Sequence, residues 1–277
     1  MVRIVTDSAS DIPAEVARQL QISVVPMYVR FGSEVYRDGV ELSPDDFYRK
    51  LAASPTIPTT SAPKVKDFNE VYDRLAQETD EIVSIHLSST FSTAYETAVR
   101  AGGTGRRRCH IEVVDSRTGA MGLGLLVIAA ARQAQLGQAG QQIARMVKES
   151  ARKTRVYVCF ETLEYLRRGG RIGRARTLLG ATIKVHPIVG LDKGEVVPLG
   201  RERSRARALD RLCRLAGECG HVSSLAVEQG AAPEEAGRLH ASLQSLFPGT
   251  DIYSSAIGCA VAAHTGPRVV GVCLYGG

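Results

Sequence analysis

The sequence has no long apolar run. The longest, at about residues 120–131, is well short of the ~20 residues that a membrane-spanning helix requires. The first residues, MVRIVTDS, enter a strand pattern at once, without the basic flank, apolar core and cleavage site of a secretory signal. A hydrophobic content of 44% and a charged content of 23% are those of an ordinary globular protein, which excludes disordered and fibrous classes. We therefore expect a cytoplasmic globular protein.

The six cysteines show no metal-binding pattern. No Cys-x-x-Cys pair occurs, and no histidine lies beside a cysteine at the spacing of zinc ligands. A chain of 277 residues without a signal does not need disulfide bonds for stability. We expect most cysteines to be small core residues and predict no metal site.

Several enzyme signatures are also missing. The Gly-x-Ser-x-Gly elbow of hydrolases is absent, and no glycine motif has the strand-turn-helix context of a dinucleotide-binding fingerprint. Phosphatase aspartates require Asp-x-Asp after a strand, whereas Asp7 and Asp11 are separated by three residues. We therefore predict that Asp7 ties down loops or caps a helix.

Lysine is scarce among the basic residues. Seven lysines leave 28 arginines among the 35 basic side chains, in a chain of net charge +6. Arginine suits bidentate contacts to carboxylate or phosphate, and it clusters at 106–108, 167–176 and 201–211. These clusters contain neither interleaved aromatic residues nor a helix suited to reading bases, so we predict no nucleic-acid binding. Arginine that is simply solvated is the other interpretation.

The first half of the chain alternates strands and helices. Apolar patterns predict strands at 2–8, 22–31, 81–87 and 111–116. The intervening patterns predict helices at 43–54, where Ser43 is the expected N-cap, at 64–77, after residue 93, and at 122–137. This alternation is typical of a doubly wound, mostly parallel sheet, in which ligands collect at the carboxyl ends of the strands.

The second half predicts a mixed α/β unit. It begins with a strand at 155–160 and a short helix through Tyr165, followed by a hairpin over 182–202 that turns at residues 192–194. Later patterns predict helices at 204–220 and 233–247, and strands at 221–229, 251–258 and 268–276. We place a domain boundary near Lys153, giving domains 1–152 and 153–277 that pack closely.

One strand-to-helix stretch is rich in hydroxyl groups. It reads IHLSSTFSTAYETA and contains neither glycine nor lysine, but it carries Ser88, Ser89, Thr90, Ser92 and Thr93. Hydroxyl donors beside the free N–H groups of a helix start favour an anion. Serine and threonine are also preferred helix caps, and Thr93 with Glu96 matches a capping box. The residues alone leave both interpretations open.

Other polar stretches have a simpler interpretation when each is taken alone. PTIPTTSAPKV places Thr59, Thr60 and Ser61 before a helix, where a proline-stiffened loop with a cap is the favoured interpretation. DSRTGAMG is a third polar strand end. A lone histidine such as His264 in AAHTGPRVVG is more often structural than functional.

Taken together and in order, eight stretches resemble the DegV family of fatty-acid-binding proteins, the lipid-holding subunits of bacterial fatty acid kinase. They are IVTDSASDIP, YRDGVELSP, TTSAPKVKDF, SSTFSTAYETA, VVDSRTGAMGLG, TLEYLRRGGRIGRA, KVHPIVGLDKGEVVPLGRERSRARAL and AIGCAVAAHTGP. The resemblance implies two α/β domains with a long-chain fatty acid buried between them.

The same resemblance implies roles for particular residues. Thr60 and Ser92 would hydrogen-bond the carboxylate, with His264 close by, and Arg171 would assist phosphoryl transfer by a partner kinase. The full set of ligand-binding residues expected from motif position is Thr60, Ser61, Ser92, Arg203, His264 and Thr265. The sequence departs from the usual pattern because threonine replaces glycine at 90 and 93, and Ala94 replaces threonine.

The function implied is that of a carrier with no catalysis of its own. It would present the fatty acid to a DAK-like, ATP-dependent kinase subunit, and the acyl phosphate formed would enter phospholipid synthesis. The chain itself would need no cofactor, since ATP and magnesium belong to the kinase, and transient membrane contact stays open. The alternative is a stand-alone enzyme acting on a small carboxylate or phosphate through the hydroxyl groups and His264. A short, wet pocket would favour the enzyme, and a long apolar pocket the carrier.

Overall fold

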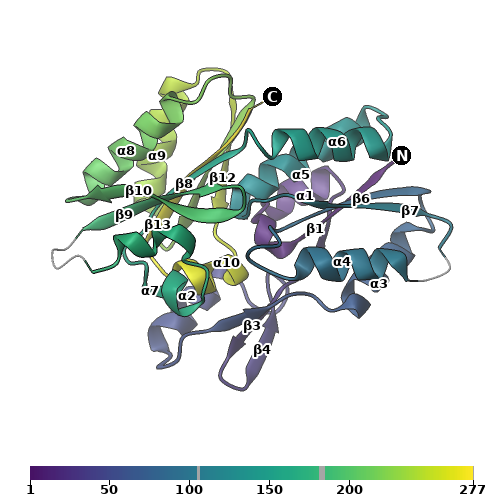
Figure 1. The fold of residues 1–277 in the computed structure, drawn as a ribbon, viewed down its shortest axis with the longest axis horizontal. Helices are drawn as coiled ribbons and strands as arrows, with labels where there is room; N and C mark the ends of the chain where they lie inside the picture. Colours follow the sequence, from purple (N-terminus) through teal and green to yellow (C-terminus); the bar gives the residue numbers. More distant parts are fainter. Residues whose placement is uncertain (105–106, 181–184, 277) are drawn as a thin grey trace.

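The computed structural model describes residues 1–104, 107–180 and 185–276. Within these ranges the chain forms two α/β halves that lie side by side (Figure 1). Residue 106 of the first arginine cluster and residues 182–184 of the expected hairpin lie outside the described residues.

The first half contains the predicted parallel sheet. Its four strands are arranged in the order β2-β1-β6-β7, and every neighbouring pair is parallel. The strands are β2 (Ser23–Val25), β1 (Arg3–Asp7), β6 (Glu81–His86) and β7 (His110–Asp115). Helices α5 (Ala120–Gln135) and α6 (Gly140–Ser150) cover one face, and α3 (Val65–Leu75) and α4 (Ala94–Gly103) cover the other (Figure 1). This doubly wound arrangement confirms the predicted fold class.

Two local predictions in this half are wrong. The expected single strand over 22–31 is divided at Pro26, with β2 in the parallel sheet and β3 (Tyr28–Phe31) in a separate one. Proline has no N–H to donate and restricts the residue before it, which favours a break in the ladder at this point. The stretch favoured as a loop is strand β5 (Thr59–Ser61), which pairs antiparallel with β3.

The small sheet is completed by β4 (Glu34–Arg37), in the order β4-β3-β5. Helix α2 (Pro44–Ala53) follows it, and Ser43 is its N-cap as predicted, because the Ser43 Oγ atom accepts from the Asp46 N–H at 3.2 Å. Near the N-terminus, a short 3₁₀ turn η1 (Ser8–Ser10) and helix α1 (Ala14–Gln19) connect β1 to β2.

The second half is a six-stranded mixed sheet, as predicted. Its order is β10-β9-β8-β13-β11-β12, and only the β11–β12 pair is parallel. The strands are β8 (Arg155–Cys159), β9 (His186–Asp192), β10 (Glu195–Glu202), β11 (Ser224–Gly230), β12 (Asp251–Ala256) and β13 (Val269–Tyr275). The β9–β10 hairpin turns through Lys193 and Gly194, both at positive φ, which confirms the hairpin predicted from this turn.

Helices of the second half lie on both sides of its sheet. The long helices α8 (Arg205–Gly217) and α9 (Pro233–Leu246) form one layer at the edge of the molecule (Figure 1). Three short elements lie nearer the first half, namely α7 (Glu164–Arg168), the 3₁₀ turn η2 (Gly173–Leu178) and α10 (Cys259–Thr265).

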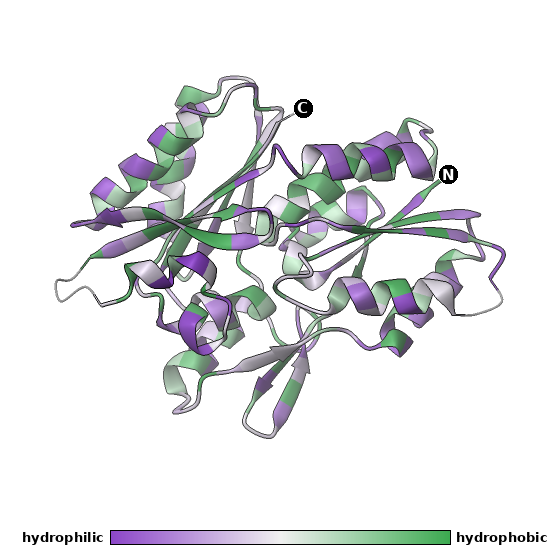
Figure 2. Ribbon diagram, in the orientation of Figure 1, coloured by the Kyte–Doolittle hydropathy of each residue, from purple (hydrophilic) through white to green (hydrophobic). Residues whose placement is uncertain are grey.

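Helix α5 contributes to the cores of both halves. Of its 16 residues, 12 are buried, and it packs against β1 and β6 of one sheet and β11 and β13 of the other. Figure 2 shows it as one of the most hydrophobic segments of the molecule. Gly122 and Gly124 permit this packing, since a Cβ there would lie 2.5 Å from Val156 and 2.6 Å from the Ser10 carbonyl. The predicted boundary near Lys153 falls in the turn after α6 and stays a prediction.

No helix within the described residues is both long enough and apolar enough to cross a bilayer.

Candidate functional site

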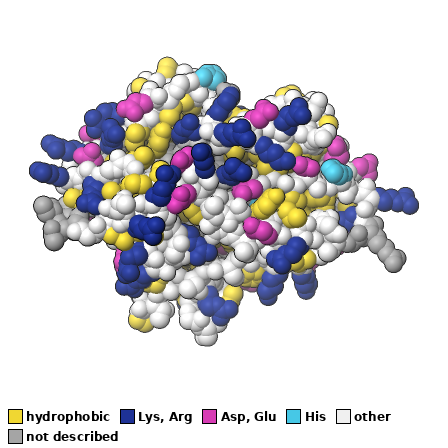
Figure 3. Space-filling model, viewed as in Figure 1, with side chains coloured by type: hydrophobic (Ala, Val, Ile, Leu, Met, Phe, Trp, Pro, Cys, Tyr) yellow, Lys and Arg dark blue, Asp and Glu magenta, His cyan; other side chains and the backbone are white. Residues whose placement is uncertain are grey.

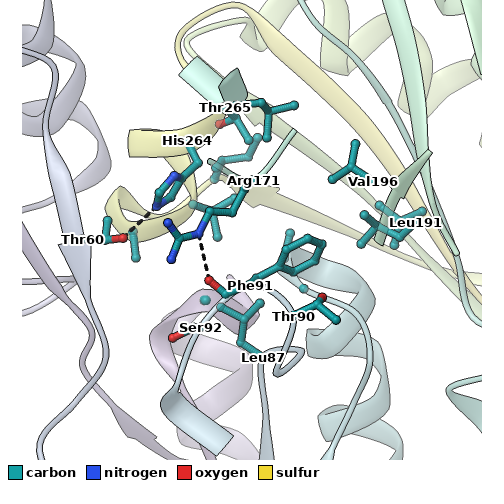
Figure 4. A pocket seen from close by; sticks show the side chains of 18 of the residues that line it. Thr60, Leu87, Thr90, Phe91, Ser92, Arg171, Leu191, Val196, His264 and Thr265 are labelled. Carbon is teal, nitrogen blue, oxygen red and sulfur yellow. Dashed lines mark hydrogen bonds between the residues drawn. The ribbon is translucent and has the colours of Figure 1, made fainter. Parts of the chain in front are cut away.

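A cavity of about 500 Å³ lies between the two halves, where the loops after β1 and β6 meet the inner face of the mixed sheet. Most of its wall is apolar, with contributions from Met27, Leu87, Val158, Phe160, Val189 and Leu191. Polar side chains lie mainly on one side: Figure 4 shows Thr60, Arg171, Ser92 and His264 there, with Leu191 and Val196 across the cavity. The arrangement suits a ligand with one polar end and an apolar body.

Thr60 and His264 form the centre of the polar side. The Thr60 Oγ1 atom on β5 lies 2.7 Å from Nε2 of His264, near the end of α10 (Figure 4). Burial, with a smaller effect of the Arg171 charge, lowers the pKa of His264 to about 4. The imidazole is therefore neutral at pH 7 and carries one N–H. If Nε2 accepts the Thr60 proton, Nδ1 carries that N–H; if Nε2 donates, the Thr60 proton is free. Only the second tautomer leaves a donor for a ligand, which is the Thr60 hydroxyl, because Nδ1 is buried against Gly169.

A glycine makes room for the histidine ring. Gly169 follows α7, and a Cβ atom at this position would overlap His264 Nδ1. That Nδ1 atom is buried and has no hydrogen-bond partner among the described residues. Gly169 therefore allows α7 and α10 to approach closely enough to place His264 at the cavity.

Arg171 connects the two halves at the polar side. Its Nε atom donates to the Phe91 carbonyl at 3.0 Å, in the hydroxyl-rich loop, and its Nη1 atom donates to the Gly169 carbonyl at 2.6 Å (Figure 4). Arg171 is half-buried, lines the cavity and makes no ion pair with any described aspartate or glutamate. A partly buried cation without a protein counterion is an electrostatic attraction for an anionic ligand.

The hydroxyl groups of the loop after β6 are partly committed to the protein. Ser89 Oγ donates to Asp115 at 2.7 Å, and Thr90 Oγ1 donates to the Gly194 carbonyl at the tip of the β9–β10 hairpin. Ser92 Oγ accepts from the Ala94 N–H at 3.2 Å, so its own proton remains available. Ser92 is therefore one of the cavity-lining hydroxyls that can donate to a ligand.

The predicted capping box of Thr93 and Glu96 is wrong. The Thr93 side chain makes no cap hydrogen bond, and its carbonyl accepts from Thr97 Oγ1 at 2.8 Å. Thr93 has φ −84° and ψ 15°, whereas a side chain that caps a helix normally projects from extended backbone. Ser92 supplies the hydroxyl at the start of α4 instead.

Asp7 has the structural role predicted for it. Its Oδ1 atom accepts from the Ala9 N–H at 3.1 Å, and its Oδ2 atom accepts from the Leu87 N–H at 3.0 Å. Oδ2 also lies 2.9 Å from Nδ1 of His86, whose Nε2 is 2.7 Å from Ser84. These three side chains are fully buried, so this Asp-His-Ser series is inaccessible to a substrate. It holds the loops after β1 and β6 in place beside the cavity.

The remaining predicted residues are divided. Ser61 and Thr265 line the cavity, and Thr265 Oγ1 is buried without a partner among the described residues. Arg203 is exposed just beyond β10 and does not line the cavity, so the structure does not bring it to the other predicted residues.

Sequence reasoning missed Glu228. It lies in β11, is only 1% exposed and lines the cavity. Its Oε2 atom accepts from the Met121 N–H at 3.0 Å, and burial raises the pKa of its carboxyl to about 7. An acidic residue within the otherwise buried strand SLAVEQG was the available signal.

Much of the arginine belongs to the solvated surface. Figure 3 shows lysine and arginine scattered over the visible face with acidic side chains among them. In the cluster at 167–176, Arg167 and Arg168 pair with Glu164, and Arg174 pairs with Asp192 at 3.0 Å. Arg171 differs from these neighbours because its guanidinium contacts backbone carbonyls at the cavity.

Comparison with known proteins finds DegV-family relatives that match nearly the whole chain. The family model described as "Uncharacterised protein, DegV family" matches residues 1–276. A DegV domain-containing protein of Streptomyces coelicolor is 36% identical over 98% of this chain and 97% of its own. Protein DegV of Bacillus subtilis is 30% identical over 98% of both chains.

Solved structures of similar proteins share the fold of this chain over nearly its whole length. A fatty acid binding protein DegV from Bacillus subtilis has a TM-score of 0.91 and 29% identity, and covers 100% of this chain and 99% of its own. A stearic acid-binding protein from Eubacterium ventriosum has a TM-score of 0.92 and 25% identity, with coverage of 100% and 98%.

Proposed function

Because the chain belongs to the DegV family, we propose that it binds a long-chain fatty acid in the cavity between its two halves. The observation that carries the proposal is the unneutralised guanidinium of Arg171 beside neutral hydroxyl and imidazole groups, at one side of an otherwise apolar cavity. A carboxylate beside Arg171 and a hydrocarbon chain along the apolar wall match this division.

The hydrocarbon chain would provide most of the affinity. At ~0.8 kcal/mol for each buried methylene, about fourteen methylenes contribute on the order of 11 kcal/mol before association costs are subtracted. The cavity volume of about 500 Å³ is within the range of small-molecule sites. The largely apolar wall supports a carrier over the alternative of an enzyme for a small carboxylate or phosphate.

The polar residues would orient the head group. A buried carboxylate without donors is costly, and three groups can compensate it. Ser92 offers its free hydroxyl proton, Thr60 offers its own when His264 Nε2 donates to Thr60 Oγ1, and Arg171 offers a positive charge. Ser61 and Thr265 lie at the same cavity and complete the proposed ligand-binding set.

We further propose that the protein does not turn over alone but presents the carboxylate to a partner, an ATP-dependent kinase of the DAK-like class. The kinase would supply ATP and magnesium, and the acyl phosphate would serve phospholipid synthesis. Phosphoryl transfer depends mainly on positioning and on stabilising charge, which a cation held by two backbone carbonyls can provide. Arg171 is the residue of this chain that we assign to that step.

Native mass spectrometry of the purified protein tests the ligand, followed by denaturing extraction and identification of what is released. We expect one long-chain fatty acid per chain, and much less with the Thr60→Val, Ser92→Ala double variant. A wild-type protein that is empty and also takes up no added fatty acid would contradict the proposal. Incubation with ATP, magnesium and fatty acid tests the second part, since acyl phosphate formed without a partner would identify an enzyme.

A further inference from the structure

Glu228 places a carboxyl group on the cavity wall away from any cation. It projects from β11 opposite Gly271 of β13, and a Cβ atom at Gly271 would lie 3.0 Å from Glu228 Oε1. The carboxyl is tightly enclosed, and no described lysine or arginine pairs with it. Among the lining residues Glu228 is the acidic one, and the other ionisable side chains of the lining are Arg171 and His264.

When Glu228 is protonated, its carboxyl O–H is a strong donor that is available to a ligand. Oε2 accepts from the Met121 N–H, so in the neutral acid Oε2 is the carbonyl oxygen and the proton is on Oε1. Burial raises the pKa to about 7, which keeps a large share of the molecules protonated near neutral pH. The thiol of Cys273 donates a weak hydrogen bond to the ionised carboxylate, which lowers the Glu228 pKa slightly against the effect of burial. No oxygen or nitrogen acceptor for Oε1 is found among the described residues.

We propose that Glu228 is a specificity-determining residue, which allows the cavity to accept an acyl chain that carries an oxygen atom along its length. The ligand class is a hydroxy or oxo fatty acid, and the Glu228 O–H donates to the chain oxygen. This inference rests on the proposed fatty-acid binding and narrows it. A fatty acid whose chain oxygen enters an apolar cavity without a hydrogen-bond partner loses affinity, whereas a chain oxygen opposite Glu228 gains a hydrogen bond from the carboxyl O–H.

The test compares stearic acid with a series of oxostearic acids in which the carbonyl moves along the chain. Calorimetric titration of the wild type should show one position, or two adjacent ones, at which the oxo acid binds as tightly as stearic acid. At the other positions the oxo acid should bind about tenfold more weakly or worse, the equivalent of one lost hydrogen bond.

Variants assign the effect to Glu228. Glu228→Leu should weaken the favoured oxo acid about tenfold, to the level of the others. Glu228→Gln should keep the preference, because its amide can accept from the Met121 N–H and still donate to the chain. Val158→Ala, at an apolar position on the same wall, should leave the order of the oxo acids unchanged.

Infrared spectroscopy of the wild type provides a readout that needs no folded apolar variant. The protonated carboxyl of Glu228 should absorb apart from ionised carboxylates, and its band should shift with the favoured oxo acid but not with stearic acid. An equal penalty at every chain position, or a preference that persists in Glu228→Leu, would overturn the inference. Failure of stearic acid itself to bind would overturn the proposed function instead, and the inference with it.

Discussion

The Thr60 Oγ1 atom and the His264 Nε2 atom lie 2.7 Å apart, although 204 residues separate them in the chain. One belongs to the small sheet that follows the first parallel strands, and the other to the short helix before the last strand. The polar side of the cavity therefore exists only when distant parts of the chain have folded together. The predictions below concern this contact and the groups around it.

Removing the free hydroxyl groups should weaken fatty-acid binding. We expect Thr60→Val and Ser92→Ala each to cost about 1 kcal/mol or more, because each removes a buried donor to the carboxylate. Calorimetric titration with one fatty acid measures both. Ser89→Ala is the matched control, since the Ser89 hydroxyl already donates to Asp115. Unchanged affinity in both variants would remove these residues from the site.

Replacing Arg171 should separate binding from phosphoryl transfer. With Arg171→Ala we expect fatty-acid binding to weaken, because the carboxylate loses a nearby cation, but to persist, because the hydrocarbon chain supplies most of the affinity. We expect formation of acyl phosphate with the partner kinase to slow far more than the change in affinity explains. The rate is measured at saturating fatty acid. Arg174→Ala is the control, as Arg174 is exposed and pairs with Asp192. Lost binding together with normal kinase activity on the residual complex would contradict the role given to Arg171.

A methyl group at position 169 should displace the histidine. In Gly169→Ala the new Cβ would overlap His264 Nδ1, so the ring must move away from Thr60. We expect the free energy of unfolding to fall by about 1–3 kcal/mol, as in other overpacked sites, and fatty-acid affinity to fall as well. Denaturant unfolding and titration measure the two effects. Gly103→Ala adds a Cβ that meets nothing within 4 Å, and serves as the control.

Stability should decrease as the pH rises through neutrality. The pKa of Glu228 is raised from 4.5 to about 7 by burial, so the folded state binds its proton more tightly than the unfolded state. Its contribution to stability is fully present below pH 4.5 and is lost as the pH rises through about 7. We expect this contribution to reach about 3 kcal/mol, at ~1.36 kcal/mol for each tenfold change in proton affinity.

Denaturant unfolding between pH 5 and pH 8 measures this slope. Burial raises the pKa of Asp11 and of Asp38 as well, so Glu228→Gln should reduce the slope without abolishing it. Glu149→Gln, on the exposed surface of α6, should leave it unchanged. A Glu228→Gln variant with the wild-type slope would mean that Glu228 is ionised in the folded protein throughout this range.

Periodic and local signals were enough to predict the main elements. The apolar helix α5, the parallel strands and the β9–β10 turn all follow from short-range patterns, and Asp7 was assigned correctly because its neighbours excluded catalysis. The division at Pro26 and the capping of α4 by Ser92 instead of Thr93 depend on backbone angles that neighbouring residue types do not determine.

The site was predicted from the resemblance more than from local pattern. Local pattern alone predicted a loop around Thr60 and a structural role for His264. Only the fold brings the two side chains within 2.7 Å of each other. Arg203 stands in an arginine-rich stretch like Arg171, yet it points to solvent because β10 has ended before it. Glu228 belongs to no motif. Its raised pKa depends on burial in the folded protein, which the residue type alone does not predict.

The burial of α5 between both sheets limits how a ligand can enter. If the two halves swung apart as rigid bodies, the helix would lose its contacts with one sheet and expose a continuous row of leucine, isoleucine and valine side chains to water. Such an opening is unfavourable, because each Å² of apolar surface exposed to water costs ~25 cal/mol. A ligand therefore has to reach the cavity without separating either sheet from α5.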